Sequence, residues 1–403
     1  MKFLGNSVFV FVLAFFSFQQ LVAQNDLYLK GIAFIDKKDY TQAVQSFNEI
    51  LQNSPGNIEA LQKRGEAFYN MGDYDKALVD FENVNGKKSA YSSIWISRCY
   101  AHKGDVIKAI DALTEHVKSP YKLPKKDILL EPAFQKIETT REWGSFWRKD
   151  WYRPYENQKA EAEYLIQKGQ SQEAVEKLNV LLNQNEDDAS LYYLRSKAYV
   201  QMDMYSEARA DLNLAVLKAP DQNVYRQERA ELYLQMNRSE DALNDYSRML
   251  KTTPDNFDLY LERANILLEM HDYKSALRDV NSYLKFFEDD VEALFLAGNI
   301  NYESGDYYEA IRSFNKVLEK DQSNEKYFVA RGNTYIKLHT FEYAANDLSM
   351  ALDLNPENPE IFLARGLAHL GLNLNKKACH DFKKAFNMGE KKALDYLQKH
   401  CDY

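Results

Sequence analysis

The sequence predicts an all-α protein built from stacked helix pairs, and three observations lead to this prediction. First, a ten-residue phrase recurs at 34-residue steps, as KDYTQAVQSF from Lys38 and GDYDKALVDF from Gly72. It returns as HDYKSALRDV from His271 and as GDYYEAIRSF from Gly305. Second, the 403 residues include only 15 glycines and 9 prolines, which favours helices with short connections. Third, small residues recur at two fixed positions, as expected for stacked repeats.

The first 23 residues have the features of a secretory signal peptide. An apolar run from Val8 to Phe18 follows a lysine, and small residues end at Ala23. The run is too short to span a bilayer, although an uncut membrane anchor is the alternative. No cysteine precedes Cys99, which excludes a lipid-modified cysteine just after the signal. We therefore expect a chain exported to the periplasm or cell envelope, or secreted, with no transmembrane segment after cleavage.

Two columns of small residues define the helices of each repeat. Twelve residues separate the columns, and a hydrophobic residue follows four positions after each alanine of the second column, on the same helical face. Small residues at both places allow close approach of the two helices. The first column is Gly31, Gly65, Ser97, Ala162, Ser196, Ala230, Ala264, Gly298, Gly332 and Gly366. The second is Ala43, Ala77, Ala109, Ala174, Ala208, Ala242, Ala276, Ala310, Ala344 and Ala378.

Charged residues repeat in pairs as well. The residue before the small column is arginine in six repeats, and an aspartate stands sixteen residues later in the same six. Repeat four reverses the signs with Glu161 and Lys177, and repeat eight has Ala297 and Ser313 and so loses both charges. This covariation predicts an ion pair between the two helices of a repeat. As an exposed pair it would contribute about 0 to 1 kcal/mol and set helix register rather than form a functional site.

An insertion at residues 119–155 interrupts the repeats. It holds three of the four tryptophans, Trp143, Trp147 and Trp151, with eight Lys or Arg against five Asp or Glu between Pro120 and Tyr155. The tryptophans are four residues apart, which predicts one stripe along a helix. We expect this stripe to act as a plug that fills the joint between two blocks of repeats. A docking patch or stacking platform with exposed rings is the alternative.

The period and columns, with an aromatic residue before the turn and prolines after the second helix, resemble the tetratricopeptide repeat family. The aromatic residues are Phe34, Phe68, Tyr100, Tyr199 and Tyr335, and the prolines are Pro55, Pro220, Pro254 and Pro356. The resemblance covers repeats one to three at residues 24–118 and repeats four to ten at residues 156–388. The chain departs from the family pattern in repeats three and four, where the spacing between repeats changes. It also has other residues in place of the family's tryptophan early in the first helix.

This resemblance implies an α-solenoid, a right-handed superhelix of about ten repeats, whose first helices line a concave peptide-binding face. The residues expected on that face are Glu228, Glu231, Glu262, Asn265, Glu269, Asn299, Glu303 and Asn333. Its acidic middle predicts a ligand with lysine or arginine. The three asparagines resemble those with which peptide-binding members hold a ligand backbone, since an amide both donates and accepts hydrogen bonds. The alternative is that asparagine merely suits a solvated helix face.

The segment 389–403 is predicted to form a final helix that caps the array, because the end of a repeat stack needs a polar cover. Such a helix, running antiparallel to the one before it, brings Cys379 and Cys401 near each other, so we expect a disulfide in an oxidising compartment. His380 and His400 are their neighbours in sequence. A metal site made of all four residues is disfavoured, because adjacent helical residues point about 100° apart.

These features favour a non-catalytic exported scaffold that binds protein or peptide partners. We expect this scaffold to hold no cofactor and no metal. The net charge of -9 disfavours nucleic acid. The chain shows no HExxH, GxSxG, GxGxxG or P-loop motif, and an enzyme with an unrecognised site is a remote alternative. A glycan- or wall-binding module that uses the tryptophan-rich insertion is the nearer one. The general arrangement, a signal peptide before a tetratricopeptide array with a basic C-terminal ending, is similar to exported repeat proteins of Gram-negative bacteria of the Bacteroidetes type.

Overall fold

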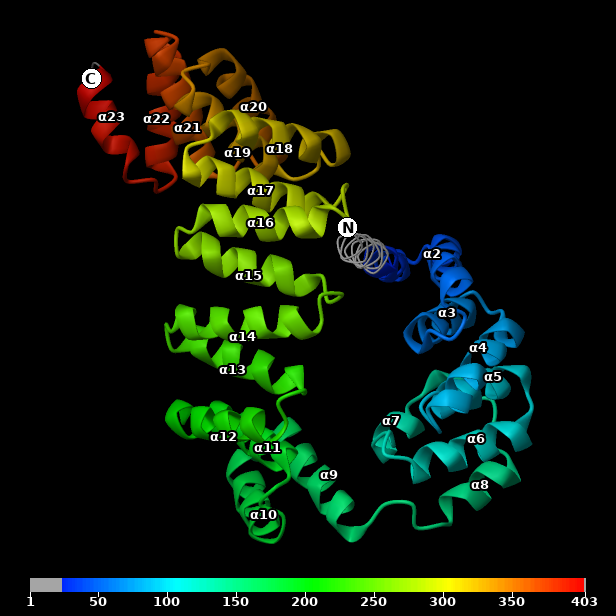
Figure 1. Ribbon diagram of the computed structural model, residues 1–403. Coiled ribbons are helices and arrows are strands. Elements are labelled where there is room, and N and C mark those ends of the chain that lie inside the picture. Colours follow the sequence, from blue (N-terminus) through cyan, green and yellow to red (C-terminus); the bar gives the residue numbers. More distant parts are fainter. Residues whose placement is uncertain (1–23, 402–403) are drawn as a thin grey trace, which may run out of the picture. The chain divides into compact units, whose positions relative to one another are not determined.

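The computed structural model describes residues 24–401, which are helical with short connections and contain no strand (Figure 1). The chain divides into two units, unit 1 ending at Tyr225 and unit 2 beginning at Arg226. The predicted signal peptide lies outside the described residues. No helix within 24–401 has the length and apolar character needed to cross a membrane.

Unit 1 holds the first five repeats and the insertion. Helical residues 24–36 pair with α2 (Tyr40–Asn53) in repeat one, α3 (Ile58–Asn70) with α4 (Tyr74–Lys87) in repeat two, and α5 (Ser93–Lys103) with α6 (Val106–Lys118) in repeat three. The insertion forms α7 (Lys125–Leu129), the 3-10 helix η1 (Pro132–Phe134) and α8 (Arg141–Trp147). Repeats four and five are α9 (Pro154–Gln167) with α10 (Ser171–Gln184), and α11 (Ala189–Gln201) with α12 (Tyr205–Lys218).

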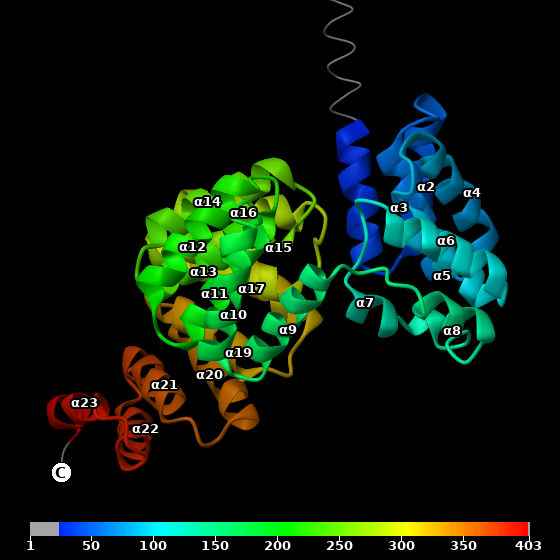
Figure 2. The same ribbon diagram turned by 90° about the horizontal axis from the view of Figure 1, so that it is seen from below.

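Unit 2 holds the remaining helix pairs. They are α13 (Asn223–Gln235), which begins at the end of unit 1, with α14 (Ser239–Thr252), α15 (Asp258–Glu269) with α16 (Tyr273–Leu284), and α17 (Val291–Ser304) with α18 (Tyr307–Lys320). Repeats nine and ten are α19 (Glu325–Lys337) with α20 (Phe341–Leu354), and α21 (Pro359–Gly371) with α22 (Asn375–Asn387). Figures 1 and 2 show the final helix α23 (Ala393–His400) beside α22, as expected for a cap.

The recurring phrase is the turn between the two helices of a repeat. Gly72 and Gly305 take left-handed φ angles of 80° and 85°, which end the first helix at no steric cost. The following Asp73 and Asp306 accept a hydrogen bond from the backbone N–H three residues later and so cap the second helix. The glycine and aspartate of the phrase therefore have separate conformational roles.

The two small columns lie where the helices of a repeat meet. All ten alanines of the second column are at most 1% exposed. A Cβ on Gly65 would lie 2.6 Å from Cε1 of Phe81, and one on Gly298 would lie 2.3 Å from Cε1 of Phe314. The predicted close approach is therefore confirmed, with the aromatic ring of the second helix resting on the glycine of the first.

The insertion packs on repeat three as the plug hypothesis expects. Phe134, Trp143 and Phe146 are 1%, 7% and 2% exposed and form one apolar cluster with Leu113 and Val117 of α6. The prediction of one helical stripe of three tryptophans was wrong, because α8 ends at Trp147. Trp151 lies beyond the helix, and its indole N–H donates to the carbonyl of Phe146 at 2.7 Å.

Candidate functional site

The predicted ion pairs join the two helices of each of six repeats. Nε and Nη2 of each arginine donate to the two carboxylate oxygens of an aspartate at 2.6 to 2.9 Å. The pairs are Arg64–Asp80, Arg195–Asp211, Arg229–Asp245, Arg263–Asp279, Arg331–Asp347 and Arg365–Asp381. The reversed pair of repeat four, Glu161 with Lys177, forms at 2.7 Å.

The expectation that these are exposed pairs was wrong. The six aspartates are only 1% to 7% exposed, because the carboxylate lies between the helices. Losing one partner of such a pair costs about 3 to 5 kcal/mol, since a buried charge is left uncompensated. The pairs therefore stabilise each of these six repeats more than an exposed ion pair would.

Five of the six arginines also reach the repeat before their own. Nη1 of Arg64 donates to Oδ1 of Asn48 at 2.6 Å, and Nη1 of Arg331 donates to Oδ1 of Asn315 at 2.7 Å. In Arg263 the acceptor is Oγ of Ser247. One guanidinium thus connects three helices, two in its own repeat and the second helix of the preceding repeat. The signal for this contact is a column of Asn or Ser sixteen residues before each arginine.

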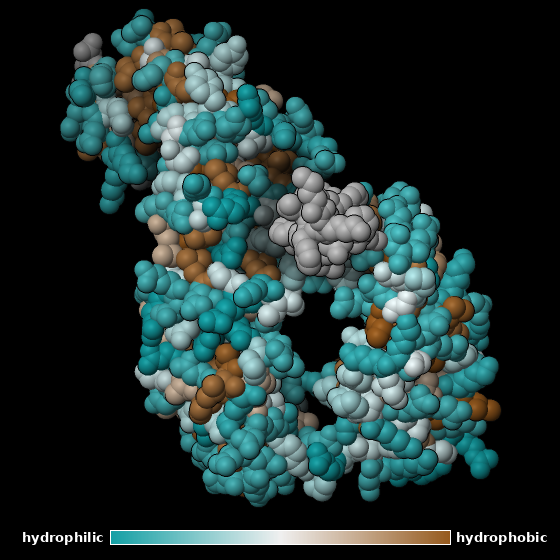
Figure 3. All heavy atoms as spheres, viewed as in Figure 1, coloured by the Kyte–Doolittle hydropathy of each residue, from teal (hydrophilic) through white to brown (hydrophobic). Residues whose placement is uncertain are grey.

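The eight residues predicted for peptide binding lie on the first helices of unit 2. Successive first helices pack side by side, α15 with α17, α17 with α19, and α19 with α21. Glu231, Asn265, Glu269 and Glu303 are exposed, while Glu228, Glu262, Asn299 and Asn333 are partly buried. Figure 3 shows a largely hydrophilic surface over these helices, interrupted by separate apolar patches. We call Glu231, Glu269 and Glu303 the acidic surface of unit 2.

Glu262 contacts a residue within the fold and is not freely available to a ligand. Its carboxylate lies close to the hydroxyl of Tyr246 on α14, a residue that is 3% exposed. Burial, together with the negative charges of Glu262 and Glu231, raises the pKa of the Tyr246 hydroxyl. Oε2 of Glu262 is buried with no hydrogen-bond partner among the described residues. This residue is therefore a poor choice for a charge reversal meant to leave the fold intact.

The asparagine column is only partly available to a peptide. Nδ2 of Asn265 donates to the carbonyl of Leu261 in its own helix at 3.0 Å. Within residues 24–401, the amides of Asn299 and Asn333 make no hydrogen bond, so both retain donors and acceptors for a ligand.

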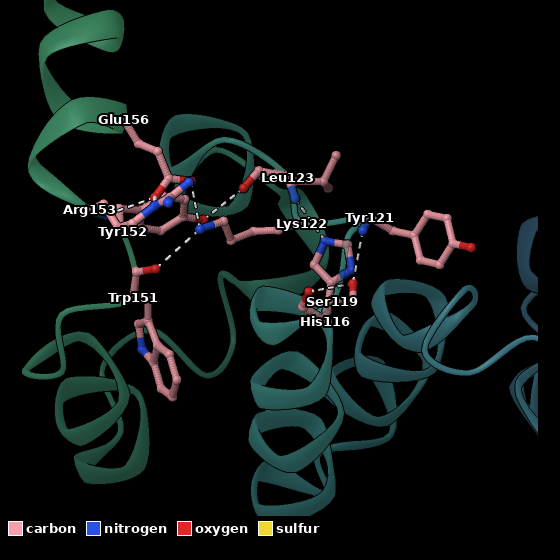
Figure 4. A network of polar contacts seen from close by, with 9 residues as sticks. All are labelled: His116, Ser119, Tyr121, Lys122, Leu123, Trp151, Tyr152, Arg153 and Glu156. Atoms are coloured by element: carbon pink, nitrogen blue, oxygen red, sulfur yellow. Dashed lines mark hydrogen bonds and ion pairs between the residues drawn. The ribbon is translucent and has the colours of Figure 1, made fainter. Parts of the chain in front are cut away.

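A polar network holds the two ends of the insertion together (Figure 4). Nζ of Lys122 donates to the carbonyl of Trp151 at 3.2 Å and forms a 2.6 Å ion pair with Glu156 at the start of α9. The hydroxyl of Tyr152 donates to the carbonyl of Leu123 at 2.7 Å. The network connects the exit from repeat three to the entry of repeat four, which makes it a structural joint.

His116 extends this joint into repeat three (Figure 4). Its Nε2 accepts a 3.1 Å hydrogen bond from the backbone N–H of Leu123, and the residue is 1% exposed. Burial, assisted by the positive charge of Arg98, lowers the pKa of His116 to about 4. The imidazole is therefore neutral at pH 7, as an acceptor Nε2 requires.

The C-terminal cysteines are covalently linked. Cys379 of α22 and Cys401, just after α23, form a disulfide with a Cα–Cα distance of 5.7 Å. Bonded to each other, neither offers a thiolate to a metal. No cluster of three metal-ligating side chains occurs in the described part of the chain. Cys99 is a buried free thiol, and burial raises its pKa to about 12, so it is unreactive near neutral pH.

The fold defines the class of protein as an array of helix-turn-helix repeats. Tetratricopeptide repeat models match residues 27–57 and 59–86, residues 189–221, and residues 228–269 and 261–325. The chain belongs to the tetratricopeptide repeat family. A search among curated proteins finds no match.

Two solved structures of bacterial repeat proteins resemble the chain. The C-terminal part of a tetratricopeptide repeat-containing protein from Cytophaga hutchinsonii is 16% identical over 59% of this chain and 99% of its own, with a TM-score of 0.51. A tetratricopeptide repeat protein from Parabacteroides merdae is 22% identical over 61% of this chain and 98% of its own, with a TM-score of 0.44. The likeness to the Cytophaga hutchinsonii protein shows a shared fold and nothing more.

Proposed function

We propose that the protein is a non-catalytic scaffold that binds basic segments of partner proteins on the acidic surface of unit 2. One observation carries the proposal: the first helices α13, α15 and α17 present the exposed carboxylates Glu231, Glu269 and Glu303, and α15 packs beside α17. A tetratricopeptide fold is suited to protein binding, and three like charges on one set of helices favour a ligand of opposite sign.

The carboxylates of this surface are exposed to solvent, which limits how strongly each of them can bind a partner. Each surface ion pair contributes about 0 to 1 kcal/mol, so several carboxylates and the amides of Asn299 and Asn333 must act together. Exposed charges are screened by salt, because the Debye length shrinks from about 30 Å at 0.01 M to about 8 Å at 0.15 M. We therefore expect binding that weakens as ionic strength rises.

A charge-reversal experiment tests this function. The probe is a fluorescent lysine- and arginine-rich peptide, titrated against the full chain without its predicted signal. The variant Glu231→Lys with Glu269→Lys and Glu303→Lys should bind it at least about tenfold more weakly. The matched control, Glu319→Lys with Asp353→Lys and Glu357→Lys, makes the same charge change at three exposed positions of unit 2 away from the first helices. Equal losses in the two variants would contradict the proposal.

We further propose that the protein works in the periplasm or cell envelope, on the basis of the N-terminal signal and the disulfide chemistry of Cys379 and Cys401. Fractionation of cells that express the full chain tests this: mature protein starting after Ala23 should appear outside the cytoplasm. The glycan-binding alternative is disfavoured by the burial of Trp143, because a sugar needs an exposed ring to stack on.

A further inference from the structure

Repeat eight differs from its neighbours at three positions that contact one another elsewhere. In repeat nine, Arg331 is held by Asp347, and its guanidinium lies 6.0 Å from the ring centre of Tyr335. Repeat two has the same set in Arg64, Asp80 and Phe68, and repeat five has it in Arg195, Asp211 and Tyr199. Repeat eight instead places Ala297, Ser313 and Asn301 at these positions.

A cavity of about 500 Å³ lies where the missing side chains would be. It opens between α16, α17 and α18, and its lining includes Leu277, Asn281, Leu294, Ala297, Asn301 and Ser313. The corresponding groove of repeat two measures about 420 Å³ and is lined by Arg64 and Asp80, without reaching Phe68. We call the deeper cavity the repeat-eight pocket.

Loss of the ion pair does not by itself create a pocket. Repeat three also lacks the pair, with Ile96 and Ala112 at the two positions. Both are buried, 8% and 7% exposed, and join the apolar cluster of Leu78 and Phe81. In repeat eight the replacements are too small and too polar to fill the space in this way.

The pocket is lined by an amide that has no hydrogen-bond partner within the described residues. Asn301 is only 9% exposed, lines the pocket, and its side chain makes no hydrogen bond to any residue of the described chain. Its amide atoms are open to solvent in the pocket, so a ligand that hydrogen-bonds them would take the place of water there. Asn281 occupies the position from which Asn48 and Asn315 accept a hydrogen bond from arginine. Its amide is likewise unpaired within residues 24–401.

The polar lining of the inner pocket is uncharged, and this selects the ligand. The aspartate that neutralises a guanidinium in other repeats is Ser313 here. Farther out, Asp306 and Glu309 are balanced by Arg312 and Lys316, and Arg312 already pairs with Glu309 at 2.7 Å. A buried cation or anion would therefore lack a dedicated counter-charge, whereas two amides and a hydroxyl offer both donors and acceptors to a neutral group.

We infer that the repeat-eight pocket binds the carboxamide side chain of a glutamine or asparagine in a partner protein. The carboxamide matches the donors and acceptors of Asn281, Asn301 and Ser313, and its aliphatic stem would rest against Leu277 and Leu294. This inference rests on the proposed function in taking the ligand to be a protein segment. The pocket is separate from the acidic surface, so either site can fail a test while the other passes.

The test uses the ¹⁵N-labelled full chain and three capped tripeptides, Gly-Gln-Gly, Gly-Glu-Gly and Gly-Arg-Gly. Titration of the glutamine peptide should shift the side-chain amide signals of Asn281 and Asn301, with affinity at least about tenfold above the two charged peptides. Stronger binding of the arginine peptide would overturn the inference, because the pocket would then be a guanidinium site. N-acetylglucosamine also carries a carboxamide, and tighter binding of this sugar would likewise overturn it.

Two variants keep the test independent of folding. The variant Ala297→Arg with Asn301→Tyr and Ser313→Asp rebuilds the set found in repeat nine and should lose at least about tenfold in affinity. Asn301→Leu removes only the amide and should weaken peptide binding without lowering the unfolding temperature. The acidic-surface variant should leave the Asn281 signal shifts unchanged. Undiminished binding by both pocket variants would contradict the inference.

Discussion

Arg64 and Asp80 are joined by two parallel hydrogen bonds of 2.8 and 2.6 Å, one to each carboxylate oxygen. Because Asp80 is 1% exposed, Arg64→Ala should lower the free energy of unfolding by about 3 to 5 kcal/mol. Arg64→Ile with Asp80→Ala copies repeat three and should recover most of that loss. Urea denaturation followed by circular dichroism measures both, and equal losses in the two variants would contradict this account of the pair.

The contact between Gly65 and Phe81 leads to a second prediction. Gly65→Ala places a Cβ 2.6 Å from the ring and should destabilise the repeat by about 1 to 3 kcal/mol through overpacking. Repeat four carries alanine and leucine, Ala162 and Leu178, at the same two positions. Adding Phe81→Leu to Gly65→Ala should therefore restore part of the stability in thermal melts. If stability does not recover, the ring of Phe81 is not the reason that position 65 requires a glycine.

His116 should make stability depend on pH between about 6.5 and about 4. Its pKa is about 4 in the folded chain and 6.5 without burial, so only the unfolded state takes up the proton as pH falls through this range. Stability supplied by neutral His116 is complete above about pH 6.5 and declines by about 3 kcal/mol towards pH 4.

The variant His116→Gln isolates this contribution. A glutamine oxygen can still accept from the Leu123 N–H but does not titrate. Melting curves across this pH range should show a shallower loss for the variant than for the wild-type chain. Parallel curves would mean that His116 is not buried as a neutral acceptor.

The number of free thiols tests the disulfide between Cys379 and Cys401 directly. After denaturation without reductant, an alkylating reagent should add once, at Cys99, and after reduction it should add three times. Cys379→Ser should also lower stability by about 3 kcal/mol, the value expected for a loop of this size. Three additions without reductant would show that Cys379 and Cys401 are not bonded.

Much of this architecture could be predicted from repetition alone, because a fixed period reports which residues occupy equivalent positions. The helix pairs and the arginine to aspartate pairs follow from single columns of residues. The third contact that five of these arginines make was missed, although the Asn and Ser column that accepts it is visible. The end of α8 before Trp151 could not be predicted, since a four-residue spacing does not state where a helix stops.

The site was less predictable than the fold. Exposure of Glu231, Glu269 and Glu303 agrees with the helical positions assigned to them, but Glu262 lies close to Tyr246 of another helix, which no spacing reveals. The pocket of repeat eight could not be predicted from the sequence for the same reason. The loss of Arg and Asp is evident in the sequence, yet whether neighbouring side chains fill the space, as Ile96 does in repeat three, depends on packing in three dimensions.

Photo-crosslinking tests the central claim most directly. A lysine- and arginine-rich peptide with a photoreactive group is bound to the full chain at low ionic strength, and the labelled residues are identified by mass spectrometry. The account predicts labelling on α13, α15 and α17 near Glu231, Glu269 and Glu303, abolished by the charge-reversal variant. Labelling on the second helices of unit 2, or on the insertion at 119–155, would contradict it.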